Sequence, residues 1–202
     1  MDTFGDPGWF HHQQIAQLWG LISLRLATPS IIPFNATLYT LKLEEYFKSL
    51  KELKIAMEIS DIQNAKDKLS LKPLGDAIKS LKGYAKRLDA TAADLRQHPS
   101  QKICYLNLFC RKRPRHGEIE KLNNAYLEFE RGFVGKGLPG RPVYKHVVYA
   151  PGTWEGYAGV TFPSIREAIA ERRWKQAEEQ VTEISKLLKK ASSKDLNIHG
   201  CT

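Results

Sequence analysis

The chain lacks the long apolar runs and the cysteine framework that would place it among membrane-spanning or disulfide-rich proteins. Its 202 residues include only three cysteines, an odd number that does not indicate a disulfide framework. Cys104 and Cys110 could pair, but their spacing matches no common zinc pattern. The most apolar stretch, residues 15–27, is interrupted by Gln17 and Arg25 and is shorter than a membrane span. No transmembrane segment is therefore predicted within the chain.

No signal peptide is predicted from the first residues, and the usual catalytic motifs are not found in the sequence. Met1 is followed by Asp2 and soon by Gly5-Asp6-Pro7, which is unlike the basic and apolar start of a signal peptide. There is no Gly-rich phosphate loop, no His-Glu-x-x-His and no nucleophile elbow. The pair His11-His12 would point about 100 degrees apart on a helix, with no carboxylate at a suitable helical offset, so one metal ion is not predicted there. We expect no catalytic apparatus and no cofactor in this chain.

Positive charge is the clearest excess, since 31 Lys and Arg residues outnumber 22 Asp and Glu residues and give a net charge of +9. Such a charge permits a nucleic-acid or acidic-lipid partner. The lysines between Lys42 and Lys82 are dispersed, however, which is typical of solvated helix faces. The basic cluster Arg111–Arg115 fits a localisation signal or an anion site, but a solvated loop is the preferred interpretation. Nucleic-acid binding is the weakest of our hypotheses, and no nucleic-acid partner is expected.

Apolar residues recur at steps of three and four along five stretches, which predicts amphipathic helices. Thr28-Pro29 ends the first helix and His98-Pro99 ends the third, because the residue before proline avoids the helical region. Residues 60–73 are polar and predict a loop or a broken helix, and a further short helix begins at Phe162-Pro163. The five stripes are Ile15–Leu26, Tyr39–Met57, Leu74–Leu95, Ile119–Phe133 and Trp174–Ala191. The chain is therefore predicted to be all-α, a helical bundle of four to five long helices.

A long segment between the last helices cannot be one regular helix. Proline and glycine recur from Arg141 to Pro163, and proline removes a backbone donor while glycine weakens a helix. The segment is also rich in aromatic and β-branched residues, which disfavours disorder. We therefore expect a long ordered loop over about 134–163, docked on a partner or on the core. Loops of this length in compact domains are often functional.

The motifs in this loop resemble those of a known family. Its residues Gly137-Leu138-Pro139, Arg141-Pro142, Tyr149-Ala150-Pro151, Tyr157-Ala158-Gly159 and Phe162-Pro163 resemble the C-terminal domain of glutamate carboxypeptidase II. That domain is the transferrin receptor-like dimerisation domain, a helical module. The resemblance covers most of residues 4–190, with a gap around 100–117 that looks like an insertion. It implies three parts: 1–10 as a remnant of the peptidase-domain junction, 11–192 as the dimerisation domain, and 193–202 as a frayed tail.

The resemblance implies a homodimerisation module from the C-terminus of a zinc metallopeptidase. The whole protein would be a hydrolase and a type II membrane protein. This domain would then be extracellular or lumenal, and the membrane anchor would lie outside the chain. The family's zinc ligands precede the position of Asp6-Pro7, so we expect zinc only in the peptidase domain and no catalysis by this chain alone. The expected partners are a second copy and the peptidase domain of the same polypeptide. A catalytically inactive receptor-like or adaptor-like homologue is the alternative.

Two positions of this chain correspond to the pair of substrate-binding residues in the family's substrate-side loop. Tyr157 matches a tyrosine that grips the terminal glutamate of the substrate, whereas Gly156 occupies the place of the family's lysine. A lysine would supply a charge-assisted bond worth about 1.5 to 3 kcal/mol, so the parent protein is not expected to select glutamate. A packed loop aromatic is an equally supported role for Tyr157. Asn35-Ala36-Thr37 fits the N-glycosylation pattern, although capping of the second helix is the preferred role of Asn35.

Overall fold

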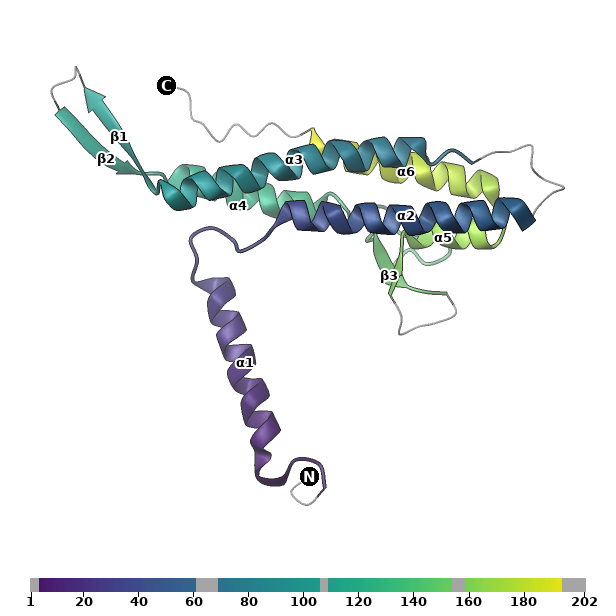
Figure 1. The fold of residues 1–202 in the computed structure, drawn as a ribbon, viewed down its shortest axis with the longest axis horizontal. Helices are drawn as coiled ribbons and strands as arrows, with labels where there is room; N and C mark the ends of the chain where they lie inside the picture. The colour runs from purple at the N-terminus through teal and green to yellow at the C-terminus, as the bar shows by residue number, and fades with distance from the viewer. Residues whose placement is uncertain (1–3, 61–68, 106–108, 154–158, 194–202) are drawn as a thin grey trace. The chain divides into compact units, whose positions relative to one another are not determined.

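A computed structural model describes residues 4–60, 69–105, 109–153 and 159–193, with the backbone alone for 101–105 and 109–114. The described chain forms a 3-10 helix, six α-helices and two two-stranded sheets (Figure 1). It divides into two compact units, residues 1–34 and 35–202, and each is described by itself. The elements are η1 (Pro7–Trp9), α1 (Phe10–Ala27), α2 (Ala36–Ser60), α3 (Lys72–Gln97), β1 (Ser100–Tyr105), β2 (Phe109–Pro114), α4 (His116–Arg131), β3 (Tyr149–Pro151), β4 (Gly159–Thr161), α5 (Pro163–Ala170) and α6 (Trp174–Ser192).

The N-terminal unit consists of η1 and α1, and Asp6 caps the start of α1. The Asp6 carboxylate accepts the backbone N–H groups of His11 at 3.0 Å and His12 at 2.9 Å, and it also contacts the His12 ring. These bonds satisfy N–H groups that have no partner within a helix. Burial acts to raise the pKa of Asp6, but the bonds from His12 and His11 outweigh it and lower that pKa to about 2.

Helix α1 confirms the predicted helix and its end before Pro29, but its apolar stripe is not a core within this unit. No residue of α1 is buried. Trp19 is 69% exposed and Leu26 is 61% exposed. Apolar residues also lie off the predicted stripe, at Leu21 and Leu24, and these are exposed as well. A helix that is apolar on most of its sides is usually covered by other protein.

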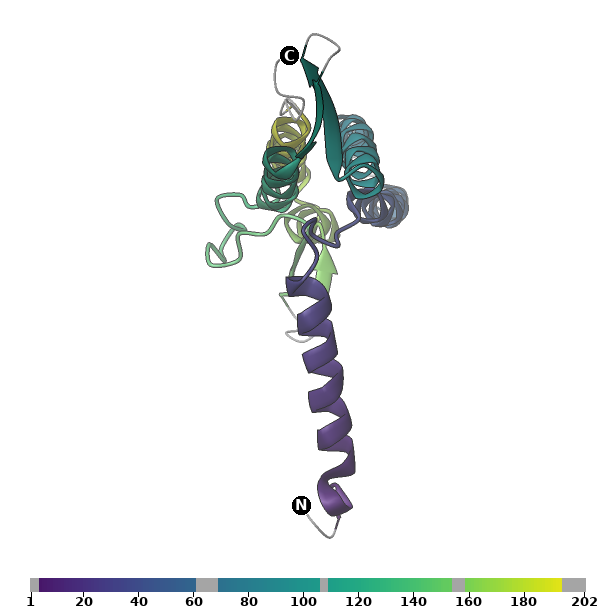
Figure 2. The same ribbon diagram turned by 90° about the vertical axis from the view of Figure 1, so that its left-hand side faces the viewer.

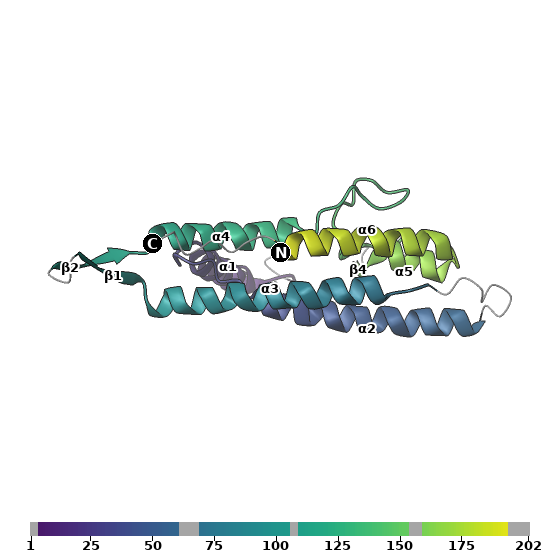
Figure 3. The same cartoon turned by 90° about the horizontal axis from the view of Figure 1, so that it is seen from above.

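The second unit is a bundle whose core is built from the predicted stripes. Helix α3 packs along both α2 and α6, and α5 packs on α6 and α2; Figure 3 shows α3 and α6 side by side. Within the described part of this bundle the long helices are α2, α3, α4 and α6, which confirms the predicted all-α bundle. Pro73 lies in the first turn of α3, where its missing N–H costs nothing. The buried core includes Leu43, Leu50, Leu74, Leu81, Leu88, Leu95, Leu122, Phe129, Val181, Ile184 and Leu188.

The end of α4 lies unusually close to α6 at Gly132. A Cβ atom placed on Gly132 would be only 2.5 Å from the Cβ of Ala191. The absence of a side chain is therefore required at this position. Gly83 in α3 differs, since nothing lies within 4 Å of the Cβ it would carry.

The N-terminus of α2 is capped twice, once locally and once from a distant helix. Asn35 Oδ1 accepts the N–H of Leu38 at 2.8 Å, which confirms the predicted capping role. From α3, the Asp89 carboxylate accepts the N–H groups of Ala36 at 3.1 Å and of the next residue at 2.7 Å. The hydroxyl of Tyr126 in α4 donates to the same carboxylate at 2.9 Å. Asp89 thus ties three helices together.

A β-hairpin joins α3 to α4, and this corrects the loop predicted for the basic cluster. Strands β1 and β2 pair antiparallel from Ser100↔Pro114 to Tyr105↔Phe109, and the hairpin faces the viewer in Figure 2. Arg115 does not belong to a solvated cluster. Its guanidinium pairs with Asp94 and Glu118, both at 2.7 Å, and its side chain is only 11% exposed. The local pattern of basic residues did not indicate either the strand pairing or these partners.

Among the helices that the structure describes, none combines the length and the apolar character needed to cross a lipid bilayer.

Candidate functional site

The candidate site is the segment between α4 and α5, which folds back on itself. The N–H of Gly135 donates to the carbonyl of Lys145 at 2.8 Å, and the N–H of Val147 donates to the carbonyl of Phe133 at 2.9 Å. Figure 3 shows this part of the chain projecting from the helices. Gly137 has φ +119°, and a Cβ there would lie 2.5 Å from the carbonyl oxygen of Pro142. This confirms an ordered loop over its described residues.

The second half of the segment is a short hairpin that carries the predicted substrate-side residues. Strands β3 and β4 pair antiparallel, with Tyr149 opposite Thr161 and Pro151 opposite Gly159. The residues between the strands include Gly156 and Tyr157, which lie outside the described residues. The structure describes the two paired strands on either side of them, which form the base of this hairpin.

Arg141 fastens the first half of the segment to the second half and to α5. Its Nη1 donates to the carbonyl of Pro151 at 2.6 Å. Its Nη2 donates to both carboxylate oxygens of Glu167, at 2.6 and 2.7 Å. Both side chains are largely buried, at 22% and 20% exposure. Charge-assisted bonds of this kind are stronger than neutral ones, so they fix the base of the β3–β4 hairpin.

A second set of contacts fastens β3 to α2. Tyr149 donates its hydroxyl hydrogen to the hydroxyl of Tyr46 in α2 at 2.9 Å. Burial is the larger cause that raises the pKa of Tyr149, and the hydrogen bond with Tyr46 raises it further. His146 stacks on the Tyr149 ring with the ring centres 5.7 Å apart. His146 Nδ1 accepts the N–H of Tyr149 at 3.1 Å, so the ring proton sits on Nε2, which lies 3.4 Å from Glu130.

Phe162 completes the base by joining β4 to α5. It is fully buried, although its backbone has φ +47°, a conformation that costs energy for a bulky residue. Its N–H donates to the carbonyl of Val148 at 2.9 Å. Burial of the ring holds the chain in this conformation, so the direction in which β4 enters α5 is fixed.

Two other positions that the sequence singles out, His12 and Asn35, make local contacts of their own. The described residues contain no group of three or more His, Cys, Asp or Glu side chains that could hold a metal ion. His12 contacts Asp6 at the start of α1. Asn35 caps α2, and its glycosylation stays a prediction. Within the described part of the chain, the segment offers a shaped, anchored surface.

The residues that anchor the segment were missed by sequence reasoning. Arg141 and Glu167 are 26 positions apart, and Tyr46 and Tyr149 are 103 positions apart. No periodic pattern links residues at such separations. The motifs Arg141-Pro142 and Tyr149-Ala150-Pro151 contain two of these four residues, but they did not indicate the contacts.

Comparison with known families decides what kind of chain this is. The model of the family described as the transferrin receptor-like dimerisation domain matches residues 69–195, which is more than half of the chain. The chain belongs to this family. The match spans α3, the β1–β2 hairpin, α4, the anchored segment and α6. Helix α2, which packs on α3, precedes the matched range.

Relatives of this dimerisation domain are longer proteins with peptidase names. A probable glutamate carboxypeptidase of Arthroderma benhamiae is 30% identical over all of this chain, which covers 25% of that protein. An aminopeptidase of Mus musculus is 30% identical over 84% of the chain and 20% of its own length. An inactive zinc metalloprotease of Schizosaccharomyces pombe is 26% identical over 95% of the chain and 22% of its own length. The chain thus spans a quarter or less of these relatives.

Proposed function

We propose that this chain pairs two copies of a glutamate-carboxypeptidase-like zinc peptidase and supplies a substrate-side loop to the peptidase domain. The observation that carries the proposal is the family match over residues 69–195. The chain is not catalytic alone in this proposal. Zinc belongs to the peptidase domain, and the longer protein is a type II membrane protein with this domain on the extracellular or lumenal side.

Pairing is tested by the molar mass of the 202-residue chain in solution. Light scattering on a sizing column, over a range of concentrations, is expected to give about 46 kDa, twice the 23.0 kDa of one chain. A second copy would form a two-fold symmetric contact, which is the commonest arrangement among soluble oligomers. A mass of one chain at every concentration would contradict intrinsic pairing.

The substrate-side role is supported by the anchored base of the β3–β4 hairpin. Contacts of Arg141, Tyr149 and Phe162 hold the two strands of that base in place. Tyr157 then contacts the substrate, and Gly156 leaves no charged partner for a terminal glutamate. In the longer protein, the Gly156→Lys variant should raise cleavage of peptides ending in glutamate relative to peptides ending in leucine. A marked glutamate preference of the unaltered protein would contradict this account of Gly156.

The exposed surface of α1 supports a second partner, the peptidase domain of the same polypeptide. All the large apolar side chains of α1 are at least 46% exposed, and exposed apolar surface of this extent usually marks an interaction site. Comparing amide exchange of α1 in the 202-residue chain and in the longer protein tests this. Equal exchange in both would contradict it.

The alternative is the dimerisation domain of a catalytically inactive homologue. The Schizosaccharomyces pombe relative, named an inactive zinc metalloprotease, favours this candidate. Zinc content and peptide hydrolysis of the longer protein separate the two. Zinc with hydrolysis supports the peptidase, and dimers without hydrolysis support the inactive homologue.

A further inference from the structure

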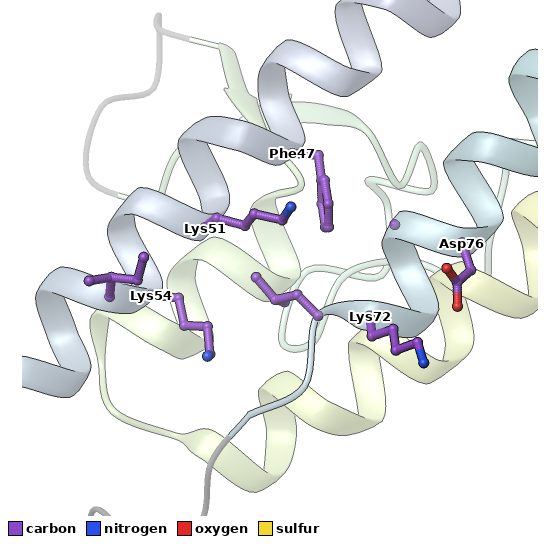
Figure 4. Close-up of a pocket in the computed structure, with 8 residues that line it drawn as sticks. Phe47, Lys51, Lys54, Lys72 and Asp76 are labelled. Carbon is purple, nitrogen blue, oxygen red and sulfur yellow. The ribbon is translucent and has the colours of Figure 1, made fainter.

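A pocket with an apolar floor and a basic rim lies between α2 and α3, and none of its lining residues belongs to the anchored segment. It has a volume of about 560 Å³, which is within the usual range for small-molecule sites. Phe47 and Ile55 of α2 and Leu71 before α3 form its apolar part. Figure 4 shows Phe47, Lys51 and Lys54 on α2 and, across from that helix, Lys72 and Asp76 at the start of α3.

Gly75 shapes the wall of this pocket. A Cβ at Gly75 would lie 2.9 Å from Cζ of Phe47, so the ring can rest against α3 only because this position has no side chain. Leu71 is almost fully buried, whereas Ile55 is 54% exposed. The floor is therefore packed at one end, and at the other it offers apolar surface that a ligand would remove from water.

The rim carries more positive charge than its neighbours neutralise. Lys54 pairs with Glu58 at 3.1 Å, but the Lys51 ammonium lies over the Phe47 ring, 4.4 Å from its centre. Among the described residues, neither Lys51 nor Lys72 has a carboxylate at ion-pair distance, and Asp76 is the one acidic lining residue. Two ammonium groups from different helices therefore border one apolar floor.

We propose that this pocket binds an anionic amphiphile, a carboxylate carried on an aliphatic chain. The carboxylate accepts hydrogen bonds from Lys51 and Lys72, and the chain lies over Phe47 and Ile55. An inorganic anion would leave the apolar floor in water, and an uncharged chain would leave both lysines without a counter-ion. The proposal is independent of dimerisation and of peptidase activity.

Calorimetric titration of the 202-residue chain with octanoate, decanoate and dodecanoate, below their micelle concentrations, tests the proposal. Affinity should rise with chain length, by up to about fourfold for each methylene that is fully buried. Decan-1-ol and inorganic phosphate supply the tail and the charge separately, and each should bind more weakly than decanoate. Equal affinity for decanoate and either probe would overturn the proposal, as would no binding of decanoate.

Two matched double variants test whether decanoate binds in this pocket. Lys51→Gln combined with Lys72→Gln should weaken decanoate binding by about tenfold or more, the effect of losing one charge-assisted bond. Lys48→Gln combined with Lys79→Gln removes two exposed lysines outside the pocket from the same two helices and should leave binding unchanged. Asp76→Asn should tighten it. Equal weakening by both pairs of variants would show non-specific attraction and overturn the proposal.

Discussion

Asp89 of α3 caps the start of α2. Replacing it with alanine should destabilise the bundle more than replacing any other polar residue that caps this helix. The carboxylate accepts two backbone N–H groups of α2, at 3.1 and 2.7 Å, and the Tyr126 hydroxyl at 2.9 Å. Loss of a helix cap costs about 1 kcal/mol, and loss of the hydrogen bond from a tyrosine that is 3% exposed costs about 1 to 2 kcal/mol more. We expect the free energy of unfolding to fall by about 2 to 3 kcal/mol.

Denaturant unfolding followed by circular dichroism measures this change, provided that the slope m is the same in both proteins. Asp89→Asn keeps one side-chain oxygen and should lose about half as much. Tyr126→Phe should lose about 1 kcal/mol, and the double variant should lose less than the sum, because the two residues share one bond. A loss below about 0.5 kcal/mol for Asp89→Ala, the range of ordinary surface changes, would refute the reasoning.

Three further predictions follow from single positions. Gly132→Ala should lower stability by about 1 to 3 kcal/mol through overpacking, whereas Gly83→Ala should raise it by about 0.5 to 1 kcal/mol; the same sign for both in thermal unfolding would contradict the packing argument. Asp6, with its pKa lowered from 3.8 to about 2, should stabilise the start of α1 fully above pH 3.8 and lose this effect as pH falls through about 2; a carboxyl NMR titration midpoint near 3.8 would count against it. Arg141→Lys should speed amide exchange at Val147 by loosening the segment's anchor, and unchanged exchange would show that the anchor lies elsewhere.

Long-range contacts explain most of what the sequence did not predict. Asp89 is 53 positions from the N–H group it caps, so no local pattern marks it as a capping residue. The sequence predicts a solvated loop for the basic cluster Arg111–Arg115, because short basic motifs often occur without a specific role, whereas residues 111–114 of this cluster lie in β2. Strand pairing depends on a partner strand, which periodicity within one segment does not reveal.

The sequence by itself determined the helices, their ends at Pro29 and Pro99, the ordered segment before α5 and the family, because these depend on residue spacing and on local motifs. Only the tertiary structure decided that Asp89 and Arg141 connect distant elements and that Gly132 is required for the approach of α4 to α6. It also decided that Lys51 and Lys72 border one pocket. These outcomes depend on which surfaces meet when the helices pack, and packing brings together residues whose separation along the chain carries no periodic signal.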